Sequence, residues 1–399
     1  MENPKFWRWA IFKIDKENIR EVLHSQRLKI VTAATLECSG DISPDGLDSF
    51  IQFYIHLSHM LRTKDAIKFQ LKYLRISANL EEEETREALA EVICNVEEVD
   101  LSESDIQSTD LLEKIASYQD LRLKHLALNN NYISEFPEYL VSKSLRKIEE
   151  VNLSNSGVRT IQLNQLFEDL QADFPDGPYP LKRLDLSHND LSYFFQPAGL
   201  CQLEELRLSR LEFKYWPDET LASVLSAIAE SSQVRLKLLD LSDNNLSKVP
   251  ASSLAEAAVK LEKFSVSRTK ISPGKITELF SRLRDRPDSR LKSLNVSNIR
   301  LTSISPGVLS DVVCRLEEAH LANTRLNTDQ VTAIFSEILT TVPLTLKHLN
   351  VSHNNLSSLT LPTLKQALAR LEEINLVSCR LNLHHVLSLD LKDFAQKYM

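Results

Sequence analysis

The sequence predicts an α/β horseshoe solenoid, with a parallel β-sheet on the concave side and helices on the convex side. Three observations predict it: a short template recurs along the chain, strand-like alternation fills each copy, and helical periodicity fills the segments between copies. A single strand and helix of this size cannot bury both of their apolar faces. Neighbouring repeats must therefore stack, which builds a continuous core.

The template places apolar residues at its first, fourth and sixth positions and recurs about twelve times within residues 71–391. Steps of about 25 residues alternate with steps of mostly 30–33 residues, so a pair of repeats is the true unit. The copies begin at Leu71, Val96, Leu123, Ile148, Leu181, Leu203, Leu236, Leu261, Leu291, Leu316, Leu346 and Leu371.

A strand is predicted in each repeat because apolar and polar residues alternate there, which places the apolar ones on one buried face. Leu236, Leu239 and Leu241 are an example. The ninth position often holds an asparagine, whose amide can donate to and accept from the backbone where the strand turns. These asparagines are Asn131, Asn189, Asn244 and Asn354. We expect them to be buried and hydrogen-bonded.

Helices are predicted between the strands, because the period of the apolar residues changes there to i, i+3, i+4, i+7. The longer repeats show this best. The apolar sets are Leu163, Leu166, Phe167 and Leu170; Leu221, Val224, Leu225 and Ile228; Ile276, Leu279, Phe280 and Leu283; and Val331, Ile334, Phe335 and Ile338.

Residues 346–381 resemble the leucine-rich repeats of the ribonuclease-inhibitor type, with the sequence LKHLNVSHNNL…LKQALARLEEINLVSCRL. They are similar also to the C-terminal repeat region of cytoplasmic nucleotide-binding immune receptors. The resemblance covers residues 71 to about 391 and implies a horseshoe that acts by binding another protein. The alternation of short and long repeats departs from the nearly equal repeats of the inhibitor itself.

The second template position alternates between lysine and glutamate in all twelve copies. Equivalent residues of adjacent parallel strands lie about 4.8 Å apart in backbone, so each lysine would stand between two glutamates. We interpret this alternation as a ladder of exposed ion pairs that keeps the strands in register. A charged binding strip is the alternative. The alternating residues are Lys72, Glu97, Lys124, Glu149, Lys182, Glu204, Lys237, Glu262, Lys292, Glu317, Lys347 and Glu372.

Outside the repeats, residues 1–70 are predicted to form a helical N-terminal cap and residues 392–399 a C-terminal tail. Within residues 1–70, the spacing of Val31, Ala34, Leu36 and Ser39 is also compatible with a decayed copy of the template. Asn3 and Pro4 are suited to a helix start. The aromatic and basic residues that follow are also compatible with a helix that docks onto a partner or lies on a membrane surface. The cap is the preferred interpretation, because an open end of a solenoid exposes its core.

Composition excludes several classes of function. The net charge of −8 lacks the basic footprint of a nucleic-acid binder, and no membrane-spanning run is present. Seven glycines cannot supply the usual phosphate-binding motifs, and no motif for catalysis, a cofactor or a metal is recognised. Five scattered cysteines without a CxxC pair indicate reduced thiols, which favours a cytoplasmic protein. A metal or pH-sensing patch at His320, His348 and His353 is a minor alternative to solvated histidines.

The binding site is predicted from the longer repeats, whose extra residues all precede the next lysine-type strand. These loops should line one rim beside a polar concave strip, which holds Asp185, Arg207, Asp240, Ser265, Asn295, His320 and Asn350. Partner contacts are predicted at Asp173, Asp176, Tyr179, Tyr193, Arg210 and Tyr215. The predicted function is non-catalytic protein–protein recognition or scaffolding, which the resemblance places in innate immune sensing. The alternative is a protein inhibitor or regulator of an enzyme, either a nuclease or a small GTPase.

Overall fold

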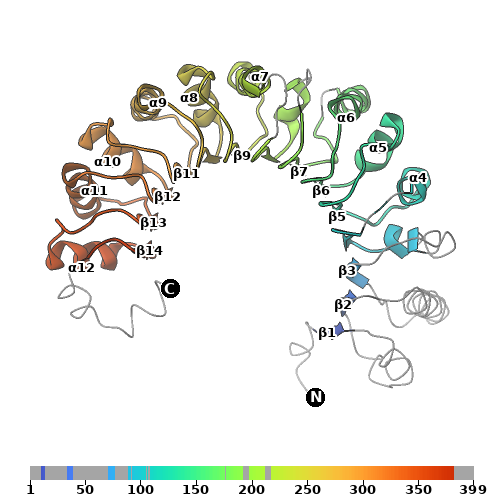
Figure 1. Cartoon of the computed structure of the whole chain (residues 1–399), viewed down its shortest axis with the longest axis horizontal. Helices are drawn as coiled ribbons and strands as arrows, with labels where there is room; N and C mark the ends of the chain where they lie inside the picture. The colour runs from blue at the N-terminus through green and yellow to red at the C-terminus, as the bar shows by residue number, and fades with distance from the viewer. Residues whose placement is uncertain are drawn as a thin grey trace. The chain divides into compact units, whose positions relative to one another are not determined.

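The computed structural model describes residues 10–13, 34–38, 71–76, 89–90, 92–104, 106, 108–175, 177–191, 197–211 and 217–381. The chain divides into two compact units, residues 1–191 and 192–399. Each unit repeats the same plan, in which parallel strands pair in the order of the sequence and helices lie on the outer side of the strands (Figure 1). The predicted α/β solenoid is therefore confirmed in each unit.

In the first unit, parallel strands alternate with helices that pack against their neighbours. The strands are β1 (Ala10–Lys13), β2 (Ala34–Cys38), β3 (Leu71–Ile76), β4 (Glu98–Asp100), β5 (His125–Ala127), β6 (Glu150–Asn152) and β7 (Arg183–Asp185). The helices are α4 (Asp110–Ser117), α5 (Glu138–Leu145) and α6 (Thr160–Asp173).

The second unit continues the pattern with longer and shorter helices in alternation. Its strands are β8 (Glu205–Arg207), β9 (Leu238–Asp240), β10 (Lys263–Ser265), β11 (Ser293–Asn295), β12 (Glu318–His320), β13 (His348–Asn350) and β14 (Glu373–Asn375). Its helical segments are the 3-10 helix η3 (Pro197–Gln202), α7 (Pro217–Glu230), α8 (Ala251–Lys260), α9 (Pro273–Asp285), α10 (Pro306–Arg315), α11 (Thr328–Thr340) and α12 (Leu361–Arg370).

The strand register agrees with the template, because the fourth positions of successive repeats pair directly. Leu239 pairs with Phe264, which pairs in turn with Leu294. All three side chains are buried, as are the apolar residues of the four predicted helical sets. A register shift by one residue would move these side chains to the opposite face, so the buried row fixes the alignment.

Each of the four asparagines at the ninth position ties a shorter repeat to the longer repeat before it. Asn354 is buried, its Nδ2 donates to the carbonyls of Leu321 (2.7 Å) and Val351 (3.0 Å), and its Oδ1 accepts from the amides of Thr324 and Leu326 (both 3.2 Å). Asn131, Asn189 and Asn244 make equivalent bonds. The expected role is confirmed, but the bonds run to the backbone of the neighbouring repeat rather than from asparagine to asparagine.

Helix ends are tied in a similar way. Lys260, the last residue of α8, donates to the carbonyls that end α7, and Arg370 does the same for α11. These cations satisfy carbonyls that have no partner inside their own helix and oppose the negative end of the helix dipole. In α11, the buried Gln330 forms a capping box with Asn327 and also donates to two carbonyls of the preceding repeat. Polar side chains thus join neighbouring repeats on both sides of the core.

Each described strand from β4 to β14 is followed by a residue in the left-handed region at the eighth template position. The φ angles range from 47° at Arg210 to 63° at Asn298. Asparagine, aspartate and histidine, which tolerate this region better than most residues, occupy many of these positions. The full set is Glu103, Asn130, Asn155, His188, Arg210, Asp243, Arg268, Asn298, Asn323, His353 and Ser378. After β4 to β14, the eighth template position therefore adopts this conformation without a glycine.

Two segments of the predicted helical cap over residues 1–70 are strands instead. β1 pairs in parallel with β2, and β2 pairs in parallel with β3. Short apolar and aromatic runs suit a strand as well as a helix, and pairing with an available sheet edge decides between them. The remaining residues of the predicted cap, and the predicted tail at 392–399, lie outside the described residues.

Candidate interaction surfaces

The lysine–glutamate alternation forms ion pairs along the edge where the strands begin. The Nζ–Oε distances are 2.8 Å for Lys124–Glu97, 3.2 Å for Lys182–Glu149, 2.7 Å for Lys237–Glu204, 2.9 Å for Lys292–Glu262 and 3.4 Å for Lys347–Glu372. Opposite charges therefore compensate one another along this edge. The ladder interpretation accounts for these paired residues. The side chain of Lys72 lies outside the described part of the chain.

The polar strip at the fifth template position serves partly to shape the turns. One side-chain oxygen of Asp240 accepts from the amide of Ser242 at 2.9 Å, and Asn295 holds Ser297 in the same way at 3.1 Å. Asp185 and Asn350 make the equivalent bond. Because these oxygens are committed to the turns, the strip presents a fixed polar surface with fewer free acceptors than the sequence suggests.

A shallow hollow of about 220 Å³ lies on the strand face of the second unit. It forms where small side chains, Ser265 and Ser293, stand between the longer side chains of Arg207, Lys263 and His320. Ordered small-molecule sites are commonly 300–1,000 Å³ and mostly apolar. A small polar hollow on an open sheet is better suited to a side chain of a larger partner.

The three histidines do not form a metal site. Burial lowers the pKa of His320, which favours its neutral form, while His348 bonds to Glu373 at 3.2 Å. His353 occupies one of the left-handed turns. Within the part of the chain that the structure describes, no group of three or more histidine, cysteine, aspartate or glutamate side chains is arranged to hold a metal ion.

The loops of the longer repeats lie where the sequence places them. In the second unit, residues 231–235, 286–290 and 341–345 precede β9, β11 and β13, which are parallel, so the loops share one edge of the sheet. The intervening strands β10 and β12 separate them. The prediction that the loops recur at every second strand is therefore confirmed for this unit.

The six predicted contact residues have different environments. Asp173 is exposed and accepts from Arg146 at 2.6 Å in the first unit, and Arg210 is exposed at a turn in the second. Tyr179 is only 2% exposed, and its hydroxyl donates to Gln171, so its ring supports the loop from inside and is not available to a partner. Asp176, Tyr193 and Tyr215 lie outside the described residues. A partner-binding role of Asp173 and Arg210 stays a prediction.

A more prominent surface in the first unit is the tyrosine edge, which we define as Tyr132, Tyr139 and Ile161. These side chains are 74%, 66% and 56% exposed. Tyr139 and Ile161 stand in the first turns of α5 and α6, which pack together and are bridged where they begin by Arg159 and Glu138, 3.1 Å apart. Tyr132 precedes α5 by a short loop. Ile161 was not predicted at the surface, because a lone apolar residue in a helix is normally assigned to the core.

Comparison with known proteins identifies the repeat. The family model described as Leucine Rich Repeat matches residues 235–256 and 345–367, which contain β9 and β13 and the turns that follow them. These repeats are leucine-rich repeats. No curated protein sequence matches the chain.

Solved structures with similar folds include an internalin (inlF) from Listeria monocytogenes, with 18% identity, a TM-score of 0.48, and coverage of 90% of this chain and 93% of the other. The leucine-rich repeat-containing protein LegL7 from Legionella pneumophila has 16% identity and a TM-score of 0.48, with coverage of 78% and 99% respectively. None of the helices in the described part of the chain combines the length and the apolar character needed to cross a lipid bilayer.

Proposed function

We propose that this leucine-rich repeat protein is a non-catalytic recognition module that binds another protein through the tyrosine edge. The observation that carries the proposal is the exposure of Tyr132 and Tyr139 within one repeat, with Ile161 exposed in the next. Exposed aromatic side chains that gather on one surface are characteristic of interaction sites, and tyrosine is enriched among the residues that dominate binding energy.

The tyrosine edge is also held rigidly, which reduces the entropy that binding must remove. Tyr132 follows Asn131, whose buried amide is fixed by bonds to the carbonyls of Leu101 and Leu128. Tyr139 is followed in α5 by the buried Leu140. The ion pair between Arg159 and Glu138 supplies a polar border beside these apolar groups. An apolar centre with a polar border is the usual anatomy of a protein interface.

The chemistry of the remaining surface supports binding rather than catalysis. The hollow on the strand face is small and polar, and the thiol of Cys314 is buried, which raises its pKa to about 12. A thiol with such a pKa is a poor nucleophile at neutral pH. No arrangement of nucleophile, base and orienting group was recognised in the sequence.

Two biological settings follow from the resemblance in repeat type. A scaffold in innate immune sensing is the one favoured here, and regulation of an enzyme such as a nuclease or a small GTPase is the alternative. The identity of the captured partner separates them, since an immune signalling component supports the first and an enzyme whose rate changes on binding supports the second.

The test is capture of partners from native cell extract with the tagged full chain, followed by mass spectrometry. The double variant Tyr132→Ala/Tyr139→Ala should lose a partner that the parent protein retains. The matched control is Val342→Ala/Val377→Ala, which removes two other exposed apolar side chains, 84% and 52% exposed, from the second unit. A partner retained equally by the parent and both variants would exclude the tyrosine edge as its binding site.

A further inference from the structure

A row of cations lies in the second unit at the position just before several of the template copies. Four consecutive repeats carry Arg235, Lys260, Arg290 and Arg315 there. The backbone amides of Arg235 and Arg290 donate to the carbonyls of Cys201 and Val259, at 2.8 and 2.9 Å, so the two arginines occupy equivalent places in their repeats.

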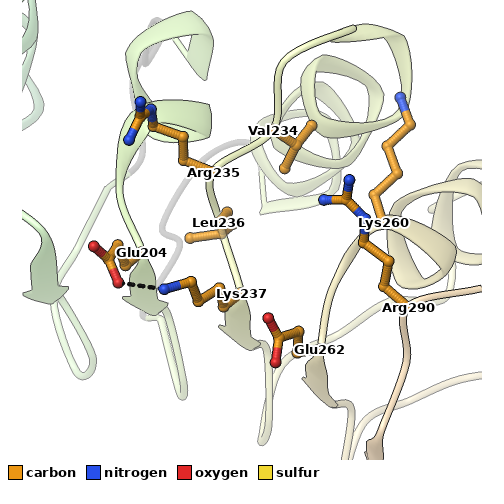
Figure 2. A pocket seen from close by; sticks show the side chains of 8 residues that line it. All are labelled: Glu204, Val234, Arg235, Leu236, Lys237, Lys260, Glu262 and Arg290. Atoms are coloured by element: carbon orange, nitrogen blue, oxygen red, sulfur yellow. Dashed lines mark hydrogen bonds and ion pairs between the residues drawn. The ribbon is translucent and has the colours of Figure 1, made fainter. Parts of the chain in front are cut away.

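The four cations differ in what their side chains contact. Lys260 and Arg315 donate to carbonyls that end the helices of the preceding repeats. The guanidinium groups of Arg235 and Arg290 make no hydrogen bond or ion pair with any described residue. Both are exposed and line a hollow of about 210 Å³. In Figure 2, Arg290 points toward the backbone around Val234 and Leu236, and Arg235 lies on the other side of that backbone.

The acidic residues of the hollow are already paired. Glu204 pairs with Lys237 at 2.7 Å, as the dashed line in Figure 2 shows, and Glu262 pairs with Lys292 at 2.9 Å. Lys260 is held by carbonyls at the end of α7, so Arg235 and Arg290 are the cations of the hollow whose side chains have no partner among the described residues, in a chain whose net charge is −8. Surface arginines in such a chain could easily have been neutralised by neighbouring carboxylates, so two unpaired guanidiniums around one hollow favour an external anion.

We infer that this hollow binds an acidic segment of a partner protein, whose carboxylates pair with Arg235 and Arg290. A guanidinium presents two parallel N–H groups that match the two oxygens of a carboxylate. The arginines precede β9 and β11, with β10 between them, so two strand spacings of about 4.8 Å each separate their backbones. Three residues of extended chain span this distance. One short acidic segment therefore reaches both arginines, and the site does not depend on the tyrosine edge.

The probe is a fluorescein-labelled oligo-glutamate peptide, titrated with the full chain at low ionic strength and followed by fluorescence anisotropy. The variant Arg235→Gln/Arg290→Gln should weaken peptide binding by about tenfold or more, because each arginine supplies a charge-assisted contact. The matched control is Arg300→Gln/Arg325→Gln, which makes the same change in net charge at two exposed arginines of the same unit and should weaken binding by less than about twofold.

Equal weakening by both double variants would overturn the inference, since it would show attraction to the charge of the whole chain rather than a site. Absence of any binding by the parent protein would overturn it as well. If inorganic phosphate at the same total charge displaces the labelled peptide as effectively as unlabelled peptide does, the hollow binds an isolated anion, and the inference of an acidic segment is wrong. Unfolding curves of both double variants should match that of the parent protein, because the bonds that Arg235 and Arg290 make to described residues come from their backbone amides, which the substitutions keep.

Discussion

Replacing Asn354 by leucine tests how strongly the buried asparagine holds neighbouring repeats together. Leucine has a similar volume but cannot form hydrogen bonds. Two backbone amides, those of Thr324 and Leu326, would lose the oxygen that they now donate to at 3.2 Å. The carbonyl of Leu321 would keep the hydroxyl of Thr324 at 2.8 Å, and that of Val351 would keep the thiol of Cys379 at 3.1 Å. The change therefore leaves two buried donors, rather than four buried groups, without a partner.

Each unsatisfied buried donor costs about 1–3 kcal/mol. Two of them give a loss of about 2–6 kcal/mol, which the burial of an apolar side chain offsets by roughly 1–2 kcal/mol. We therefore expect Asn354→Leu to lower the free energy of unfolding by about 3 kcal/mol. Because the lost bonds lie between two repeats, the amides of Thr324 and Leu326 should also exchange with solvent faster than those of distant repeats.

The assay is urea denaturation followed by circular dichroism, together with hydrogen exchange at the two amides. Asn355→Leu is the matched control, because Asn355 is exposed and accepts one bond, from the amide of Ser357 at 3.2 Å. The control should cost less than about 1 kcal/mol. If the two variants unfold at the same urea concentration, the buried asparagine does not stabilise the interface and the reasoning is wrong.

Three further outcomes are expected. Glu149→Lys, which replaces the attraction between Glu149 and Lys182 at 3.2 Å by repulsion, should lower stability by about 1–2 kcal/mol at low salt and by less at high salt, as measured by denaturation midpoints. Burial lowers the pKa of His320 below 6.5, so the unfolded chain binds the proton more readily than the folded chain. The free energy of unfolding should therefore decrease as the pH falls below about 6.5. His320→Asn should show a smaller decrease between pH 7 and pH 5, as measured by denaturation at each pH. The thiol of Cys314, whose pKa burial raises to about 12, should be alkylated by iodoacetamide only after unfolding, as peptide mass spectrometry would detect.

The core and the ion-pair ladder could be predicted because their signals recur in every repeat. Leu239, Phe264 and Leu294 are adjacent in the sheet because the template aligns them, and periodicity alone locates them. The same holds for Lys237 and Glu204, whose opposite charges follow from the alternation. A feature that appears once per repeat occurs about twelve times in the chain, so chance does not account for the pattern.

Features that depend on single residues were predicted less well. Tyr179 was expected at the surface because it lies in a proline-rich loop, yet its ring fills the interior while its hydroxyl reaches Gln171. Ile161 shows the opposite error, because an apolar residue at the start of α6 is normally assigned to the core but its side chain is exposed. The left-handed turns were missed because residues as different as Arg210 and Asn298 adopt them, so backbone geometry set by the neighbouring strand outweighs local preference. The strand β1 was not predicted, whereas β2 lies where the spacing of Val31, Ala34, Leu36 and Ser39 allowed a decayed copy of the template.

The ties between repeats have a direction, and it bears on how the chain is made. Asn354, Gln330, Lys260 and Arg370 each donate to the backbone of the repeat that precedes them in the sequence. During synthesis from the N-terminus, a newly emerged repeat therefore has exposed carbonyls and amides that only the next repeat can satisfy. Growth of the solenoid and completion of its hydrogen bonds are then coupled on the ribosome. We therefore expect each repeat to reach its full set of hydrogen bonds only after its successor has emerged.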